Sequence, residues 1–232
     1  MGKLNCNHLK IQDSHSLITT KDGSHTLFNK ELGEHYHSTF GAIQESEHIF
    51  INGALDRFKH KKSSIDILEI GFGTGLNALL TLLWADKNRI AVSYHGLESY
   101  PISFEVASSL NYYKELHVDQ ELFLKLHQFS EDPIKATEFF TIKHEMQKLE
   151  KAVFLADHYD IVYFDTFSPE VQPELWTAEI FQKLFRTIKT NGVLTTYSCK
   201  GDVKRAMRTA GFEIEKLPGP PGKREFIKAT KK

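Results

Sequence analysis

The chain has 232 residues, of which 41% are hydrophobic and 25% are charged, an ordinary composition for one compact globular domain or one domain with a small extension. The net charge of −1 gives no global signal for a nucleic-acid partner, and the apolar stretch 76–85 is about half of what a bilayer span needs. The N-terminus lacks the apolar core of a signal peptide, and the two cysteines, Cys6 and Cys199, fit a reducing cytosol better than a disulfide framework.

The N-terminal quarter of the chain reads as an extension. Residues 16–29 alternate around Asp22-Gly23, and because both turn residues tolerate a positive φ angle, this segment predicts a β-hairpin. Residues 34–55 predict irregular structure leading into a short helix or strand. We therefore expect an N-terminal extension over 1–60 and a main domain over 61–232, and whether residues 1–25 are ordered or form a lid stays open.

From residue 65 onward the chain alternates between strands and helices. Strands are expected over 65–71, 90–99, 138–146, 159–165 and 192–198, followed by two late strands over 212–217 and 224–230. Helices are expected over 76–87, in pieces over 102–130, over 173–189 with Asn191-Gly192 as the stop, and over 202–210. This order predicts an α/β, doubly wound sheet that binds its ligand beyond the carboxyl ends of the strands. The two late strands have no helix between them, which predicts an antiparallel last strand.

A glycine-rich loop follows the first strand of this domain, in the segment "DILEIGFGTGLN". Gly71, Gly73 and Gly75 stand at every second position, whereas the dinucleotide fingerprint needs its third glycine where Leu76 stands. With the acidic Glu69 before it, this tighter loop resembles the S-adenosylmethionine (SAM) loop of class I methyltransferases. Glu69 and Asn77, which is near the start of the following helix, are candidates for cofactor binding together with the glycines. The competing interpretation is a glycine turn that only allows close packing of helix and sheet.

Two further carboxylates are expected at strand ends. Glu98, in "GLESYP", stands where an acid accepts hydrogen bonds from ribose hydroxyls, although a surface glutamate can also end a strand. Asp165, in "YFDTFSPEVQPELW", ends the fourth strand among apolar and proline residues. A carboxylate beside an apolar wall can accept a proton or orient an amine, and the alternative is an aspartate that caps the next element.

These segments carry a resemblance to a known family. "GFGTGLN", "ESYP", "FDTFSPEVQPELWT", "TYSCKGDVKRAMRTAGF" and "GPPGKREF" are similar, in this order and spacing, to the tRNA 5-methylaminomethyl-2-thiouridine methyltransferases, over roughly residues 26–230. The resemblance implies a class I SAM-dependent methyltransferase fold and methyl transfer from SAM to the aminomethyl nitrogen of a tRNA wobble uridine. It corresponds to the MnmD type, or to the methyltransferase half of the bifunctional MnmC enzymes.

The resemblance also implies roles for individual residues. The glycine loop would hold the methionine part of SAM, Glu98 the ribose, and Glu145 would approach the adenine where the family usually has Asp. Asp165 would face the target amine. Four further residues are expected on the substrate side, with the last two near the mouth of the site: Phe167, Pro169, Lys223 and Arg224.

The expected cofactor is SAM alone. The bifunctional relatives carry an FAD-dependent domain, and we expect no FAD here, because the chain ends at Lys232. A metal site is not expected either, since His35 and His37, on one face of a predicted strand, lack further ligands. Cys199 is interpreted as structural, because methyl transfer needs no covalent step.

The expected partner is tRNA, with no membrane contact, in the cytoplasm. Residues 200–232 hold ten Lys or Arg and four Asp or Glu, a local charge of +6 that suits phosphate contacts or simply a solvated surface. Tyr36, Phe40 and Phe167 are candidates for stacking on a flipped-out base, with core packing preferred for Phe40.

Three other functions remain open from the sequence. The first is a class I methyltransferase that acts on a small molecule or a protein amine. The second is aminopropyl transfer from decarboxylated SAM, which uses a similar fold and the same kind of acceptor. The third is a non-catalytic RNA-binding module, which would have no need of the glycine loop, Glu98 and Asp165 together.

Overall fold

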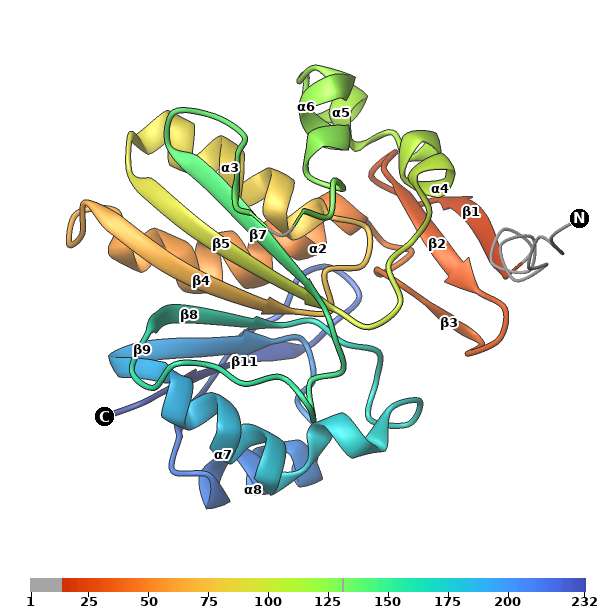
Figure 1. Ribbon diagram of the computed structural model, residues 1–232. Helices are drawn as coiled ribbons and strands as arrows, with labels where there is room; N and C mark the ends of the chain where they lie inside the picture. Colours follow the sequence, from red (N-terminus) through yellow and green to blue (C-terminus); the bar gives the residue numbers. More distant parts are fainter. Residues whose placement is uncertain (1–13, 131) are drawn as a thin grey trace, which may run out of the picture.

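The main body is an eight-stranded mixed sheet with helices on both faces (Figure 1). The computed structural model describes residues 14–130 and 132–232. The strand order is β10-β11-β9-β8-β4-β5-β7-β6, and the five central strands from β9 to β7 are parallel. Their bounds are Ser64–Ile70 (β4), Ala91–Glu98 (β5), Phe140–Met146 (β7), Tyr159–Phe164 (β8) and Ile188–Thr196 (β9).

Antiparallel strands extend the sheet at both edges. At one edge β11 (Glu225–Thr230) pairs with β9, and β10 (Glu213–Pro218) pairs with β11, which confirms the predicted antiparallel end. At the other edge the short β6 (Ile134–Lys135) pairs with β7, a pairing that the sequence did not predict. The chain fills the sheet outward from β4 to β7 and then returns to β8, so the topological switch point lies between β4 and β8.

Helices bury the two faces of the sheet in two separate cores. One core contains α3 (Leu76–Asn88) and the short helices α4 (Phe104–Ser109), α5 (Tyr112–Glu115) and α6 (Gln120–Lys125). The other contains α7 (Ala178–Thr187) and α8 (Gly201–Thr209). Among the described residues, no helix is both long and apolar enough to cross a membrane.

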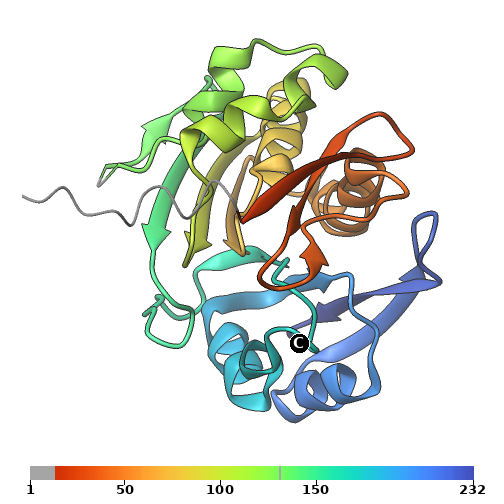
Figure 2. The same cartoon turned by 90° about the vertical axis from the view of Figure 1, so that its right-hand side faces the viewer.

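The N-terminal hairpin forms as predicted and gains a third strand. β1 (His15–Thr19) pairs with β2 (His25–Asn29), and β2 pairs with the two-residue β3 (Glu34–His35). This small sheet stands against the carboxyl ends of the central strands of the main sheet (Figure 2). Cys6 and residues 1–13 of the segment considered as a lid lie outside the described residues.

Residues 42–58 fold as a helix with several turns, which settles the choice between helix and strand. The segment runs as α2 (Ala42–Ser46), the wider-wound η1 (Glu47–Leu55) and the 3-10 turn η2 (Asp56–Phe58). Seven of its apolar side chains are buried in the same core as α3, namely Ala42, Ile49, Phe50, Ile51, Ala54, Leu55 and Phe58. The extension and the main domain therefore share one core, and the boundary near residue 60 stays a prediction.

The helix expected over 173–189 differs from its prediction at both ends. A 3-10 turn, η3 (Pro173–Trp176), precedes α7, and α7 stops at Thr187. Asn191-Gly192 does not end the helix, because β9 already begins at Ile188 and runs through both residues. Asn191 has φ 65°, and the register between β8 and β9 shifts at this point, so the pair bends a strand.

Candidate active site

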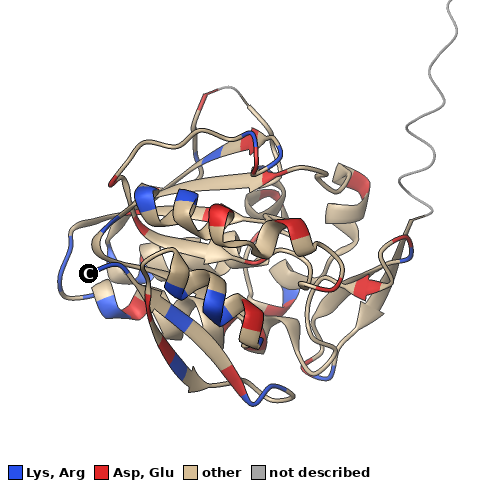
Figure 3. Cartoon of the chain, turned by 90° about the horizontal axis from the view of Figure 1, so that it is seen from below, with Lys and Arg blue, Asp and Glu red and all other residues tan. Residues whose placement is uncertain are grey.

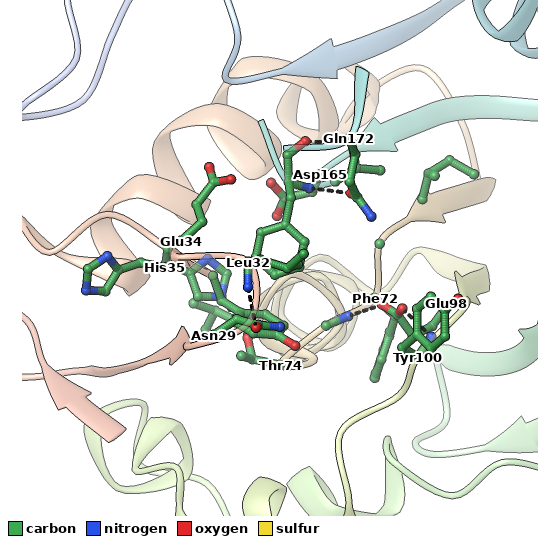
Figure 4. Close-up of a pocket in the computed structure, with 18 of the residues that line it drawn as sticks. Asn29, Leu32, Glu34, His35, Phe72, Thr74, Glu98, Tyr100, Asp165 and Gln172 are labelled. Carbon is green, nitrogen blue, oxygen red and sulfur yellow. Dashed lines mark hydrogen bonds between the residues drawn. The ribbon is translucent and has the colours of Figure 1, made fainter. Parts of the chain in front are cut away.

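A cavity of about 1200 Å³ opens at the carboxyl ends of the central strands. Its walls come from the glycine loop, the ends of β5 and β8, the small N-terminal sheet and the loop between β10 and β11. Figure 4 shows Glu34 and His35 of β3 on one side, Glu98 and Tyr100 on another, and Asp165 with Gln172 on a third. The cavity is lined by these residues predicted from the sequence: Gly71, Gly73, Asn77, Glu98, Asp165, Phe167 and Lys223.

The glycine loop brings the ends of β4 and β8 into contact. Gly71 has φ +84°, and a Cβ atom there would lie 2.5 Å from the backbone oxygen of Asp165. The Asp165 amide donates a hydrogen bond of 2.9 Å to the Ile70 carbonyl. Gly75 has φ +73° and caps the N-terminus of α3. Glycine is therefore needed here both for the turn and for the close approach of the end of β8.

Glu98 is fixed at the end of β5 by two backbone amides. Gly73 N–H donates to its Oε2 at 3.0 Å and Tyr100 N–H donates to its Oε1 at 2.9 Å (Figure 4). A carboxylate has about four lone-pair sites, so each oxygen keeps capacity for a second donor. Glu98 therefore presents a rigid acceptor beside the loop, as ribose hydroxyls require.

Asn77 connects two carboxyl groups beneath the loop. Its Nδ2 donates to Asp165 Oδ2 at 2.8 Å and to Glu69 Oε1 at 2.8 Å, and Tyr94 OH donates to Glu69 Oε2 at 2.7 Å. Glu69 is fully buried and does not line the cavity. Burial raises its pKa well above the usual value. Glu69 thus supports Asn77 from behind, and Asn77 in turn orients Asp165.

Asp165 combines burial with access to the cavity. Burial, and next the negative charge of Glu45, raise the pKa of Asp165 to about 7, while the Asn77 hydrogen bond and the Lys223 charge lower it. A carboxyl group with a pKa near neutrality can hold or release a proton at physiological pH. Asp165 is therefore suited to accept a proton from a bound amine.

A buried ion pair that the sequence did not predict joins α2 to the C-terminal hairpin. Lys223 Nζ lies 2.5 Å from Glu45 Oε1, with the Glu45 side chain only 8% exposed, and 4.1 Å from the centroid of the Tyr197 ring. Ser38 N–H donates to the other Glu45 oxygen at 2.7 Å. Glu45 falls in a segment without clear periodicity, and its partner is distant in sequence, so only the fold reveals the pair.

Aromatic side chains form another wall of the cavity. The Tyr36 ring meets the Phe167 ring edge-on with a centroid separation of 5.0 Å. Phe167 is held by its backbone, because its N–H donates to Gln172 Oε1 at 3.1 Å and its carbonyl accepts from Trp176 Nε1 at 3.0 Å. The core position expected for Phe40 is wrong: this ring is 44% exposed and lines the cavity.

Five predicted site residues do not line this cavity. Glu69 lies behind it, and Gly75, at the end of the loop, is buried. Glu145 Oε2 lies 3.2 Å from His95 Nε2, while the next residues of the chain, Met146 and Gln147, line the cavity instead. The remaining two, Pro169 and Arg224, line a smaller neighbouring cavity.

The two N-terminal histidines have separate surroundings. The expectation that they share one strand face is wrong, because β3 ends at His35 and His37 lies beyond it. His37 is buried and its Nε2 pairs with Thr74 Oγ1 at 2.7 Å. In the part of the chain that the structure describes, no three His, Cys, Asp or Glu side chains group as a metal site.

The cavity has the donors and acceptors that a sulfonium nucleoside needs. The glycine loop is joined to Glu98 by the hydrogen bond from Gly73 N–H, and Asn77 Oδ1 is buried with no hydrogen-bond partner among the described residues. An acceptor atom without a donor in a buried position indicates a missing donor. These residues fit SAM, with its ammonium and ribose hydroxyls as the donors.

A comparison with protein families identifies the class. A family model described as "S-adenosyl-L-methionine-dependent methyltransferase" matches residues 118–232. Residues 118–232, the C-terminal half of the chain, belong to the S-adenosyl-L-methionine-dependent methyltransferases. This agrees with the predicted family, fold class and cofactor.

Among curated proteins, this methyltransferase is similar to MnmC proteins. It is 31% identical over 219 residues to the "tRNA 5-methylaminomethyl-2-thiouridine biosynthesis bifunctional protein MnmC" of Burkholderia multivorans, covering 87% of this chain and 33% of that protein. The protein of the same name from Leptospira interrogans is 28% identical over 221 residues, covering 87% of this chain and 33% of that protein. The chain thus spans about a third of the length of these relatives.

Solved structures support the same relationship. The methyltransferase superimposes on MNMC2 from Aquifex aeolicus with a TM-score of 0.73 and 28% identity, covering 94% of this chain and 70% of that one. Spermidine synthase from Thermotoga maritima gives a TM-score of 0.57 at 16% identity, covering 93% and 68%, which shows a shared fold alone.

Proposed function

We propose that this methyltransferase transfers a methyl group from SAM to the aminomethyl nitrogen of 5-aminomethyl-2-thiouridine at the wobble position of tRNA. The observation that carries the proposal is Asp165, held by Asn77 beside the glycine loop and open to a cavity with an aromatic wall. The similarity to the MnmC proteins supports the choice of acceptor.

The residues of the chain have to prepare an amine for attack. A free aminomethyl group is mostly protonated near neutral pH, and only its neutral form is a nucleophile. Transfer into a cavity lined by Tyr36, Phe167 and Tyr197 favours the neutral form, and Asp165 takes the released proton. Proton transfer to a positioned base contributes about 10²–10⁴ in rate.

Alignment supplies the rest of the rate enhancement. SAM, when bound, supplies a methyl group already activated by its sulfonium. The glycine loop and Glu98 fix the cofactor end of the cavity, and Asp165 fixes the amine end. Holding two reactants in line is worth up to roughly 7–11 kcal/mol, so few polar groups are needed.

The proposed partner is tRNA, and the proposed place of action is therefore the cytoplasm. The aromatic wall suits a single unstacked base, which is how proteins commonly read RNA loops. Figure 3 shows positive and negative residues mixed over the helices and the C-terminal hairpin on the underside, so the phosphate contacts must be local.

The test is tRNA-dependent transfer of a labelled methyl group. Purified protein, labelled SAM and tRNA bearing 5-aminomethyl-2-thiouridine should give labelled tRNA, and the same tRNA without the aminomethyl group should not. Labelling of a small amine in place of tRNA would favour a small-molecule methyltransferase. Turnover of decarboxylated SAM in place of SAM would favour aminopropyl transfer.

A further inference from the structure

A second cavity, of about 290 Å³, adjoins the large one. Tyr197 and Lys223 line both cavities, so the two spaces share a wall. The smaller one lies between the end of β9 and the loop joining β10 to β11, and its other walls include Ser198, Lys200 and Arg224. None of these three residues belongs to the large cavity.

One wall of the small cavity holds an unused hydrogen-bond donor. Ser198 is only 5% exposed, and its Oγ is buried with no hydrogen-bond partner in the structure. A buried hydroxyl without a partner carries a desolvation penalty unless a ligand pairs with it. The Ser198 hydroxyl therefore indicates that an acceptor binds here.

The start of α8 adds backbone donors at the same place. α8 is nine residues long, and its N-cap is Lys200, which lines the cavity and makes no side-chain capping bond. The first N–H groups of the helix have no intrahelical partners, and the helix dipole makes this end partly positive. Such an end favours an anion with several acceptor oxygens.

The charges around the cavity leave Arg224 as the available cation. Lys200 pairs with Glu170 and Lys223 pairs with Glu45. Arg224 is exposed and forms no ion pair with any residue that the structure describes. Glu225 also lines the cavity, but Lys216 Nζ holds its two oxygens at 2.8 Å and 2.9 Å.

We propose that the small cavity binds one phosphodiester of the RNA substrate, the one that directly flanks the nucleoside in the large cavity. This inference rests on the proposed function. The shared wall at Tyr197 and Lys223 is what makes the phosphate a neighbour of the target nucleoside. The Ser198 hydroxyl, the Arg224 guanidinium and the first amides of α8 would donate to its oxygens.

The test uses a stem-loop RNA bearing the target nucleoside, with a neutral methylphosphonate placed on its 5′ or its 3′ side. With RNA that carries no methylphosphonate, Arg224→Gln should raise KM by about tenfold, the effect of losing a hydrogen bond to a charged group. It should also reduce the slope of log affinity against log salt concentration by about one. Ser198→Ala should raise KM in the same direction. The matched control is Arg208→Gln, which removes an exposed charge from α8 away from both cavities.

The decisive observation is whether the effect of Arg224→Gln depends on the methylphosphonate in the RNA. One of the two methylphosphonates should weaken the wild type about tenfold and leave Arg224→Gln almost unaffected. Two outcomes would overturn the phosphate site alone. One is an equal rise in KM for Arg224→Gln and Arg208→Gln. The other is that each methylphosphonate raises KM by the same factor in the wild type and in Arg224→Gln. If the wild type binds SAM but does not methylate the RNA that carries the target nucleoside and no methylphosphonate, the proposed function is overturned and this inference with it.

Discussion

At the scale of single residues, the proposed proton transfer depends on the carboxylate of Asp165. Its oxygen Oδ2 is held by Asn77, which leaves Oδ1 for the amine. Asp165→Asn keeps the shape and loses the base, so the single-turnover rate should fall by about 10²–10⁴. The SAM dissociation constant, measured by calorimetry, should stay within about twofold. A full-rate Asn variant would remove Asp165 from its catalytic role.

The pH dependence of folding stability gives an independent test of the same group. The pKa of Asp165 is about 7 in the folded protein, against 3.8 for an ordinary aspartate. The contribution of Asp165 to folding stability is therefore largest below pH 3.8 and falls as the pH rises from 3.8 to about 7. In that range the unfolded chain releases the proton while the folded protein keeps it. Asp165→Asn should therefore raise Tm relative to the wild type at pH 8 and much less at pH 5. An equal Tm difference at both pH values would show that burial does not raise this pKa.

Single residues also separate what the sequence could predict from what it could not. Gly71, Glu98 and Asp165 were predictable, because each follows a strand and the carboxyl ends of parallel strands meet at one edge. The position of Glu145 outside the cavity was not predictable. The alternation of side chains along β7 leaves Glu145 beside His95, while Met146 reaches the cavity. A one-residue offset in a strand moves a side chain to the other face.

At the scale of elements, the ion pair between Lys223 and Glu45 joins α2 to the C-terminal hairpin. Lys223→Met would leave the Glu45 carboxylate buried without a positively charged partner among the described residues, with the Ser38 N–H still donating to it. Unfolding in urea should show that the free energy of unfolding falls by about 2 kcal/mol. This loss is smaller than the roughly 3–5 kcal/mol for breaking a fully buried pair, because Lys223 is partly exposed.

A matched control and a rescue accompany this prediction. Lys216→Met breaks the exposed pair with Glu225 in the same hairpin, and its loss should be about 0–1 kcal/mol. Adding Glu45→Gln to Lys223→Met should recover part of the stability. Equal losses for the two Lys→Met variants would show that the Glu45 pair is energetically a surface pair.

Element boundaries were predictable only where local signals and packing agree. The turn at Asp22-Gly23 formed as expected because its residues suit a hairpin in any context. Asn191-Gly192 is an equally strong local signal, yet it lies within β9, since Ile188 pairs with Tyr159 before the bend. Pairing with a distant strand overrode the local helix stop.

At the scale of the whole molecule, the alternation of strands and helices was enough to predict the sheet. The position of the N-terminal sheet was not predictable, because its contacts with the cavity are distant in sequence. Ser168 N–H, for example, donates to Glu34 Oε2 at 3.2 Å, and Tyr36 packs on Phe167. The extension thereby supplies part of the cavity wall, a position that its own composition does not signal.

The proposed reaction requires this protein to bind SAM and to methylate the aminomethyl nitrogen of a wobble uridine. Nucleoside mass spectrometry tests it directly, after incubation of the protein with SAM and bulk tRNA carrying 5-aminomethyl-2-thiouridine. We predict a gain of one methyl group on that nucleoside with the wild type, and little gain with Asp165→Asn in the same time. An unchanged nucleoside, in a reaction where SAM binding is verified, would contradict the choice of acceptor.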